Sequence, residues 1–114
     1  MSFAEYWHDK SIDKWQEVTA AFPELDIYFV LTNEAVGSDP HELDIHIAYE
    51  RNRCILAQRD GFKCVIGKLA NGTPHFDLWQ EWYAPWIVEA FEDYGALYGR
   101  HVSGIVTGKH RLRP

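Results

Sequence analysis

Four acidic side chains recur at every fourth residue near the start of the chain, and this spacing favours a role in binding. They are Glu5, Asp9, Asp13 and Glu17. Residues four apart are neighbours on a helix surface, where like charges destabilise the helix by roughly 0.2 to 0.5 kcal/mol per pair. Lys10 and Lys14 lie beside the row and relieve this repulsion only in part. We interpret the row as a surface for a basic protein partner, with an ordinary solvated helix face as the alternative.

Three tryptophans fall within a short segment around Ala84 and Pro85. They are Trp79, Trp82 and Trp86. Core packing is the commoner use of tryptophan, but each buried indole N–H needs a hydrogen-bond partner, so three are difficult to bury together. We therefore add these residues to the candidate partner-binding surface, which would suit either a foreign protein or a homodimer.

Basic side chains in the middle of the sequence favour a different function, nucleic-acid binding. The candidate residues are Arg51, Arg53, Arg59, Lys63 and Lys68, with Phe62 available to stack on a base. The formal net charge of the chain is −6. Because the field of an acidic protein repels phosphate, nucleic acid is the less favoured partner.

The sequence contains no familiar catalytic motif. It has no glycine-rich phosphate loop, no Gly-x-Ser-x-Gly elbow and no His-Glu-x-x-His pair. The best local set of metal-binding residue types is His41, Asp44 and His46, but zinc takes three or four ligands in a tight geometry that this set does not guarantee. We expect no cofactor and no enzymatic activity, and a small metal-dependent enzyme is the second alternative.

A helix is predicted over residues 3–22, and it would carry the acidic row. Its apolar stripe advances by three and four residues. The stripe consists of Ala4, Trp7, Trp15, Val18 and Phe22, with Ser11 in the remaining slot. Ser2 and Glu5 have the spacing of a capping box, and Pro23 is expected to end the helix.

Four strands are predicted next, at residues 24–31, 42–49, 54–59 and 62–68. The first two alternate apolar and polar residues with the period of two that strands show. Asp60-Gly61 separates the last two strands and is typical of a tight hairpin turn. In that hairpin Cys54 and Cys64 would emerge on opposite faces and could not form a disulfide. Free thiols favour a cytoplasmic location.

The rest of the chain is predicted to contain two helical segments and one more strand. A short segment begins at Asp77, and a main helix runs from Pro85 to Tyr98, where Gly99 ends it. An edge strand at 101–107 and a basic tail at 108–114 would follow.

Together these elements predict one α+β domain, residues 1–114, built as a two-layer sandwich. An antiparallel sheet of four or five strands would carry the N-terminal and C-terminal helices on one face. No segment approaches the apolar length of a membrane span, and the N-terminus lacks the pattern of an export signal. The predicted function is that of an acidic inhibitor, immunity or chaperone-like protein that binds a basic protein partner without catalysis.

Overall fold

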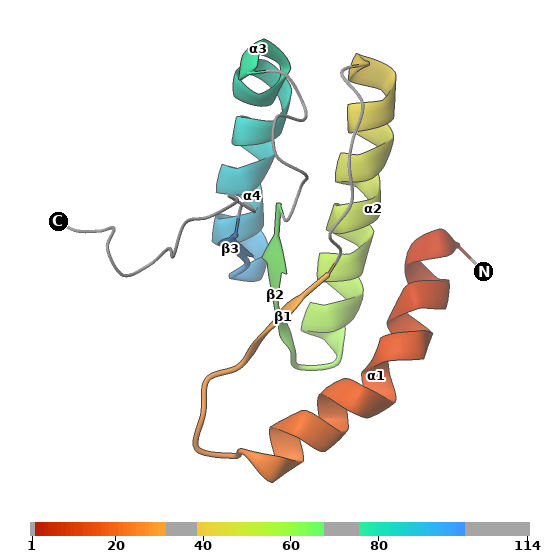
Figure 1. The fold of residues 1–114 in the computed structure, drawn as a ribbon, viewed down its shortest axis with the longest axis vertical. Helices are drawn as coiled ribbons and strands as arrows, with labels where there is room; N and C mark the ends of the chain where they lie inside the picture. The colour runs from red at the N-terminus through yellow and green to blue at the C-terminus, as the bar shows by residue number, and fades with distance from the viewer. Residues whose placement is uncertain (1, 32–38, 68–75, 100–114) are drawn as a thin grey trace, which may run out of the picture.

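The computed structural model describes residues 2–31, 39–67 and 76–99, which form helices packed on a small sheet (Figure 1). The helices are α1 (Phe3–Ala21), α2 (Pro40–Arg59), α3 (Phe76–Leu78) and α4 (Ala84–Tyr94), and a π-helical turn η1 (Trp79–Tyr83) joins the last two. The strands are β1 (Tyr28–Val30), β2 (Lys63–Ile66) and β3 (Leu97–Tyr98). The helices α2 and α4 stand side by side, and α1 packs against the lower part of α2.

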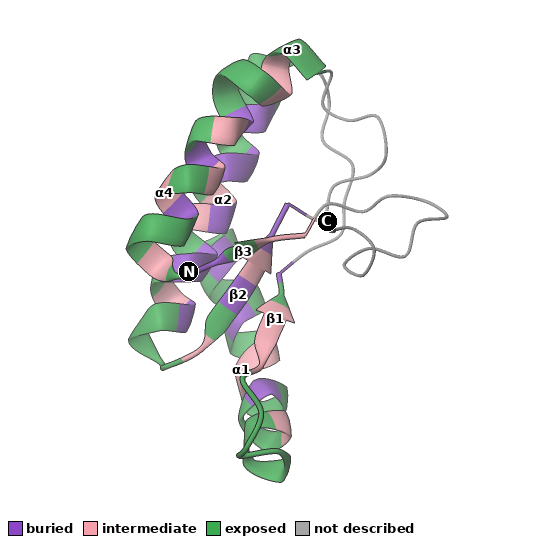
Figure 2. Cartoon of the chain, turned by 90° about the vertical axis from the view of Figure 1, so that its left-hand side faces the viewer, coloured by how far each residue is buried: buried purple, intermediate pink, exposed green. Residues whose placement is uncertain are grey.

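The sheet is parallel throughout its described strands, so the predicted antiparallel sheet of four or five strands is wrong. Its order is β1-β2-β3, with Phe29 beside Cys64 and Val65 beside Leu97. Parallel neighbours need a long crossover connection. Here α2 and α4 lie in the two crossovers, on one face of the sheet (Figure 2). The described elements therefore form a mostly helical layer on a small parallel sheet.

The second and third predicted strands belong to the single helix α2. Asp39 caps this helix by accepting a hydrogen bond from the backbone N–H of His41, and Pro40 occupies its first turn. The buried residues of α2 follow helical spacing; they are Leu43, His46, Ile47, Glu50, Arg53, Cys54 and Ala57. Three of them are polar, so the apolar residues alone do not show the helical period. The alternation that suggested a strand includes Ile45, which is 57% exposed in the helix.

Asp60-Gly61 ends α2 and does not form a β-hairpin. Gly61 has a left-handed φ of 87°. Its N–H donates to the carbonyl of Gln58 at 3.1 Å, and the N–H of Phe62 donates to the carbonyl of Ala57 at 2.8 Å. This pair of bonds is the Schellman arrangement that closes a helix. The hairpin prediction is wrong because a glycine at positive φ serves both a hairpin turn and a helix end.

The two cysteines lie in the core between α2 and β2. Cys54 and Cys64 are both buried and free, as predicted. The argument from opposite faces of a hairpin does not apply, because the two thiols interact across the contact between helix and strand. This interaction, together with burial, raises the pKa of Cys54.

The helix α1 has the predicted location and the predicted N-terminal cap. The N–H of Ser2 donates to Glu5 Oε1 at 2.7 Å, and the N–H of Glu5 donates to Ser2 Oγ at 3.1 Å. Trp15 is buried and stacks on Phe29 of β1 with ring centroids 4.8 Å apart. The buried residues of α1 are Ala4, His8 and Trp15. Trp7, which the stripe placed in the core, is exposed.

The C-terminal helix is shorter than predicted. It ends at Tyr94, where Gly95 adopts a left-handed φ of 65°. Leu97 and Tyr98, predicted as helical, form β3 and pair with β2. The predicted edge strand 101–107 and the basic tail 108–114 lie outside the described residues.

Candidate functional site

The acidic row lies on α1, at the edge of the helical layer (Figure 1). All four of its carboxylates are exposed, but their surroundings differ. Glu5 takes part in the capping box, and the hydrogen bonds from the backbone and side chain of Ser2 lower its pKa. Glu17 pairs with Lys14 at 3.3 Å on an exposed surface, where such a pair contributes little. Asp9 and Asp13 form no salt bridge with the described residues.

Three neighbouring aromatic rings occupy the first turns of α1 and form an exposed cluster. They are Phe3, Tyr6 and Trp7, called here the aromatic cluster, and their exposed fractions are 64%, 44% and 41%. Trp7 makes edge contacts with Phe3 and with Tyr6 at centroid distances of 6.1 and 5.2 Å. Phe3 also contacts the ring of Tyr49 on α2 at 5.4 Å. Exposed rings packed against one another are typical of contact surfaces for other proteins.

Sequence reasoning missed the aromatic cluster because it assigned Trp7 to the core stripe. The available signal was the presence of Phe3 and Tyr6 close to Trp7 on one turn of helix. The cluster therefore joins the acidic row as a second feature of the exposed surface of α1.

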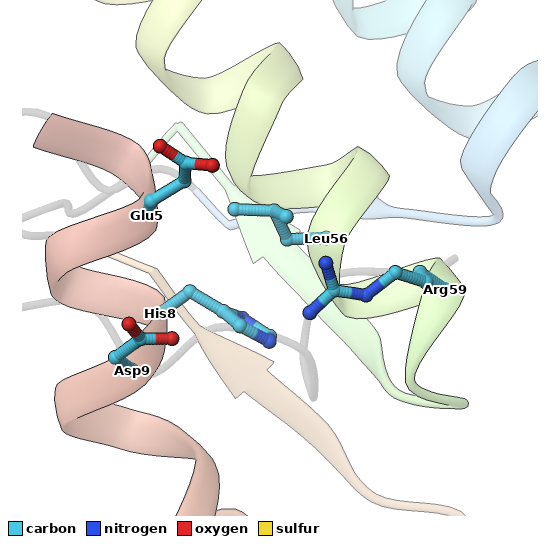
Figure 3. Close-up of a pocket in the computed structure, with 5 residues that line it drawn as sticks. All are labelled: Glu5, His8, Asp9, Leu56 and Arg59. Atoms are coloured by element: carbon cyan, nitrogen blue, oxygen red, sulfur yellow. The ribbon is translucent and has the colours of Figure 1, made fainter. Parts of the chain in front are cut away.

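A pocket of about 290 Å³ opens between α1 and α2 (Figure 3). Glu5, His8 and Asp9 line it from α1, and Leu56 and Arg59 line it from α2. Figure 3 shows His8 projecting from α1 into the gap between the helices and Arg59 extending toward it. The pocket thus begins where the acidic row passes closest to α2.

Asp60, the residue that ends α2, binds two of the side chains that line the pocket, Arg59 and His8. Arg59 donates to its two carboxylate oxygens, from Nε at 3.1 Å and from Nη2 at 2.9 Å. Nε2 of His8 lies 2.7 Å from Asp60 Oδ2. The hydrogen bonds with Arg59 and His8 hold the pKa of Asp60 at about 2, and the same carboxylate raises the pKa of Arg59. Asp60 is therefore ionised at neutral pH and neutralises Arg59.

The three candidate tryptophans have different locations. Trp86 is buried and donates its indole N–H to Glu50 at 2.9 Å. Trp79 is half-buried and donates to the hydroxyl of Tyr98 at 3.2 Å. Trp82 is exposed and is the member of this group that a partner could reach in the described structure.

The basic residues proposed for nucleic acid do not form one patch. Arg51 makes two 2.8 Å hydrogen bonds to the carboxylate of Glu89, and Lys63 pairs with Asp26 at 3.1 Å. Arg53 is buried. The remaining candidates are Arg59, which is bound to Asp60, Phe62, which is half-buried against Trp15, and Lys68, which lies outside the described residues. Internal partners thus neutralise most of the described cations.

The proposed metal residues point in different directions. His41 and Asp44 are exposed near the start of α2, whereas His46 is buried. In residues 2–31, 39–67 and 76–99, no group of three or more His, Cys, Asp or Glu side chains is placed to hold a metal ion.

His46 instead lies beside Glu50, a fully buried carboxylate that sequence reasoning did not single out. Nε2 of His46 is 3.3 Å from Glu50 Oε2, which is an ion-pair distance without hydrogen-bond geometry. Burial acts to raise the pKa of Glu50, but His46 and the hydrogen bonds from Tyr83 and Gly67 outweigh it, so the pKa lies below its usual value. The carboxylate has no exposed surface, so it acts as an internal anchor and not as a group that meets a ligand.

Comparison with known proteins gives no relative for this chain. No protein-family model matches it, and no curated protein or solved structure matches it significantly. Among the described helices, none combines the length and apolar character needed to cross a membrane.

Proposed function

We propose that the chain is a non-catalytic protein-binding domain of the inhibitor, immunity or chaperone-like kind, and that it engages a basic partner through α1. The observation that carries this proposal is the exposed aromatic cluster beside the acidic row on one peripheral helix. Interface centres are enriched in aromatic residues, and a polar rim surrounds them. The aromatic cluster and the acidic row would contribute differently to the binding of a partner.

The aromatic cluster supplies the apolar area. Burying an aromatic side chain stabilises a complex by about 1.5 to 3 kcal/mol relative to leaving it in water. Phe3, Tyr6 and Trp7 already contact one another, so a partner that covers them orders few additional side-chain rotations. The contact of Phe3 with Tyr49 also links the cluster to α2.

The acidic row supplies attraction and selectivity. Exposed carboxylates steer a basic partner toward the helix and repel acidic proteins. Asp9 and Asp13 are central in the row and form no salt bridge with described residues. Both side chains are exposed, so their charge is available to a cationic surface of a partner.

The buried free thiols of Cys54 and Cys64 support a reducing compartment for this function. A cytoplasmic location is accordingly part of the proposal. Partner capture from a lysate of the organism that encodes the chain is the appropriate starting measurement.

The test compares the wild-type chain with the charge-reversal variant Asp9→Lys, Asp13→Lys, Glu17→Lys. A matched control reverses three exposed carboxylates elsewhere, with Asp44→Lys, Glu81→Lys and Glu92→Lys, and changes the net charge by the same amount. We expect the wild type and the control to retain the same basic protein and the α1 variant to lose it. The isolated complex should weaken as salt is raised, because exposed charges are screened.

A captured protein that binds all three chains equally contradicts the proposal. A second contradiction would come from sedimentation of the purified chain. If it forms a dimer that Trp7→Ala dissociates, then the aromatic cluster is an interface between two copies and not a site for a foreign partner.

A further inference from the structure

We propose that the segment 101–107 of this chain covers the second face of the sheet, the face that points away from α2 and α4. The surface that it covers is a row of three aliphatic side chains, called here the open row, which consists of Val30, Val65 and Leu97. The inference is carried by the register of the sheet, by the exposure of the open row and by the point at which the chain leaves β3. It goes beyond the proposed function, because it does not involve the surface of α1.

The open row crosses all three described strands. Val65 of β2 is the Cα partner of Val30 in β1 and of Leu97 in β3. Partner residues in neighbouring strands point to the same face of a sheet. On β2, Cys64 and Ile66 are 2% and 1% exposed and belong to the core that the helices share. Because side chains alternate along a strand, the open row points away from that core.

No described element covers the open row. Val30 is 51% exposed and Leu97 is 41% exposed, and Val65 is half-buried between them. Figure 2 shows α2 and α4 on the same side of the strands. All-parallel sheets occur almost entirely with both faces covered. The apolar character and the exposure of the open row therefore indicate a further layer on this face.

The path of the chain selects that layer. The strands advance from β1 to β2 to β3, and crossovers that advance in one direction place their helices on one face, because nearly all are right-handed. The helix α1 also packs on that face, since its Trp15 stacks on Phe29, which alternates with Val30. The N–H of Gly99 donates to the carbonyl of Ile66 at 2.9 Å, so the chain after Gly99 leaves directly from the edge of the sheet. The segment that follows Gly99 therefore starts beside the open row.

The length and composition of the segment 101–107 suit this face. It contains no Asp, Glu, Lys or Arg, and its branched apolar residues are Val102, Ile105 and Val106. Neighbouring strands lie about 4.8 Å apart, so a row across three strands is about 10 Å long. Seven extended residues reach roughly 23 Å, which is enough to cross it. A second copy of the chain fits less well, because a stable dimer buries about 800 Å² per partner and the open row offers three aliphatic side chains.

Methyl NMR on the full chain, with isotope labels in Ile, Leu and Val, tests the contact directly. We expect nuclear Overhauser contacts from the methyl groups of Ile105 to those of Val65 and Leu97, and none from Leu112. A second sample, which mixes labelled and unlabelled chains, detects contacts between different molecules. Contacts within one chain support the inference. Contacts between different chains alone would assign the face to a second copy, and the absence of contacts would leave it to a foreign partner, so either result overturns the inference.

Urea denaturation tests the same contact by its energy. The four chains are the wild type, Leu97→Ala, Ile105→Ala and the double variant. Ile105→Ala should raise the equilibrium constant of unfolding about tenfold in the wild-type background, which equals about 1.4 kcal/mol. The increase should be only about twofold when residue 97 is already alanine, because contacting residues are energetically coupled.

The matched control is Leu112→Ala, which shortens an apolar side chain of similar size outside the segment. It should leave the equilibrium constant of unfolding unchanged. The inference is overturned if Ile105→Ala has no effect, if its effect is the same in both backgrounds, or if Leu112→Ala has an equal effect. None of these results bears on partner capture by α1, so the inference and the proposed function fail separately.

Discussion

The hydroxyl of Tyr83 donates a 2.6 Å hydrogen bond to Glu50 Oε1 and so joins η1 to α2 inside the core. The same oxygen accepts the indole N–H of Trp86, and Oε2 accepts the backbone N–H of Gly67 at 3.0 Å. One carboxylate thereby connects α2, the end of β2, η1 and α4. A buried charge is tolerated when it is fully hydrogen-bonded, and it becomes strongly destabilising once its partners are removed.

Replacing Glu50 by glutamine should destabilise the fold. Glutamine has the same shape, but its amide N–H₂ replaces one of the two accepting oxygens. This group would face either the N–H of Gly67 or the donors of Tyr83 and Trp86, so a buried donor would lack an acceptor. We expect Glu50→Gln to lower the free energy of unfolding by about 2 to 3 kcal/mol and Tyr83→Phe by about 1 to 3 kcal/mol. Urea denaturation at neutral pH measures both changes.

The control for this prediction is Glu92→Gln on the exposed surface of α4. Its effect should stay within about 0.5 kcal/mol, as for most surface substitutions. An equally small effect of Glu50→Gln would show that the buried carboxylate does not stabilise the fold.

Two glycines with similar backbone angles should differ in their tolerance of alanine. Gly61 and Gly67 have φ values of 87° and 80°. A Cβ atom at Gly61 meets open space, so Gly61→Ala should cost about 1 to 2 kcal/mol from the left-handed backbone alone. A Cβ atom at Gly67 would collide with the ring of Tyr98 and approach the hydroxyl of Tyr83 at 3.3 Å. Gly67→Ala should therefore cost about 1 to 3 kcal/mol more than Gly61→Ala. Equal losses in urea denaturation would contradict this close packing at the end of β2.

The contribution of Asp60 to stability should disappear in acid. Its pKa is about 2 in the folded chain, against an ordinary value of 3.8, because Arg59 and His8 stabilise the ionised form. A lowered pKa contributes stability that is complete above the unfolded value and is lost as the pH falls from 3.8 toward 2. We expect Asp60→Asn to unfold more easily than the wild type at neutral pH, with the difference shrinking across that interval. Thermal unfolding midpoints at several pH values measure it, and a difference that does not change with pH would contradict it.

Local signals explain which elements the sequence revealed. The start of α1 was predictable because the capping box of Ser2 and Glu5 acts within four residues. The strands β1 and β2 fall inside predicted strands because Phe29 and Cys64 face the helices while their neighbours do not. The alternation of apolar and polar residues does not reveal that these strands pair in parallel, because the same alternation fits parallel and antiparallel strands.

The helix α2 was missed for a physical reason, the polarity of its buried face. His46, Glu50 and Arg53 occupy core positions where periodicity analysis expects apolar residues. The missed helix also hid the pocket, since Leu56 and Arg59 reach His8 only when α2 crosses α1. The acidic row was visible because it lies within one helix, whereas the pocket depends on a contact between distant parts of the chain.

Arg53 occupies the contact between α1 and α2 without a carboxylate partner among the described residues. It is 2% exposed, its Nη1 donates to the hydroxyl of Tyr49 at 2.8 Å, and its Nε has no partner. The guanidinium lies 5.6 Å from the ring centroid of Trp15 and 5.9 Å from that of Tyr49. Ring contacts of this kind compensate a buried cation only in part.

Methionine should therefore replace Arg53 without loss of stability. It is unbranched, fills a similar channel and contacts aromatic rings favourably, and it removes a charge whose burial is unfavourable. We expect the free energy of unfolding of Arg53→Met to equal that of the wild type or exceed it by up to about 2 kcal/mol. Arg53→Ala should lose about 2 to 4 kcal/mol, because it leaves a cavity beside Trp15. Urea denaturation of the wild type and the two variants measures these changes. If Arg53→Met lowers the free energy of unfolding as much as Arg53→Ala does, the prediction is wrong. The contacts of the guanidinium, and not the volume that the side chain fills, would then hold α1 against α2.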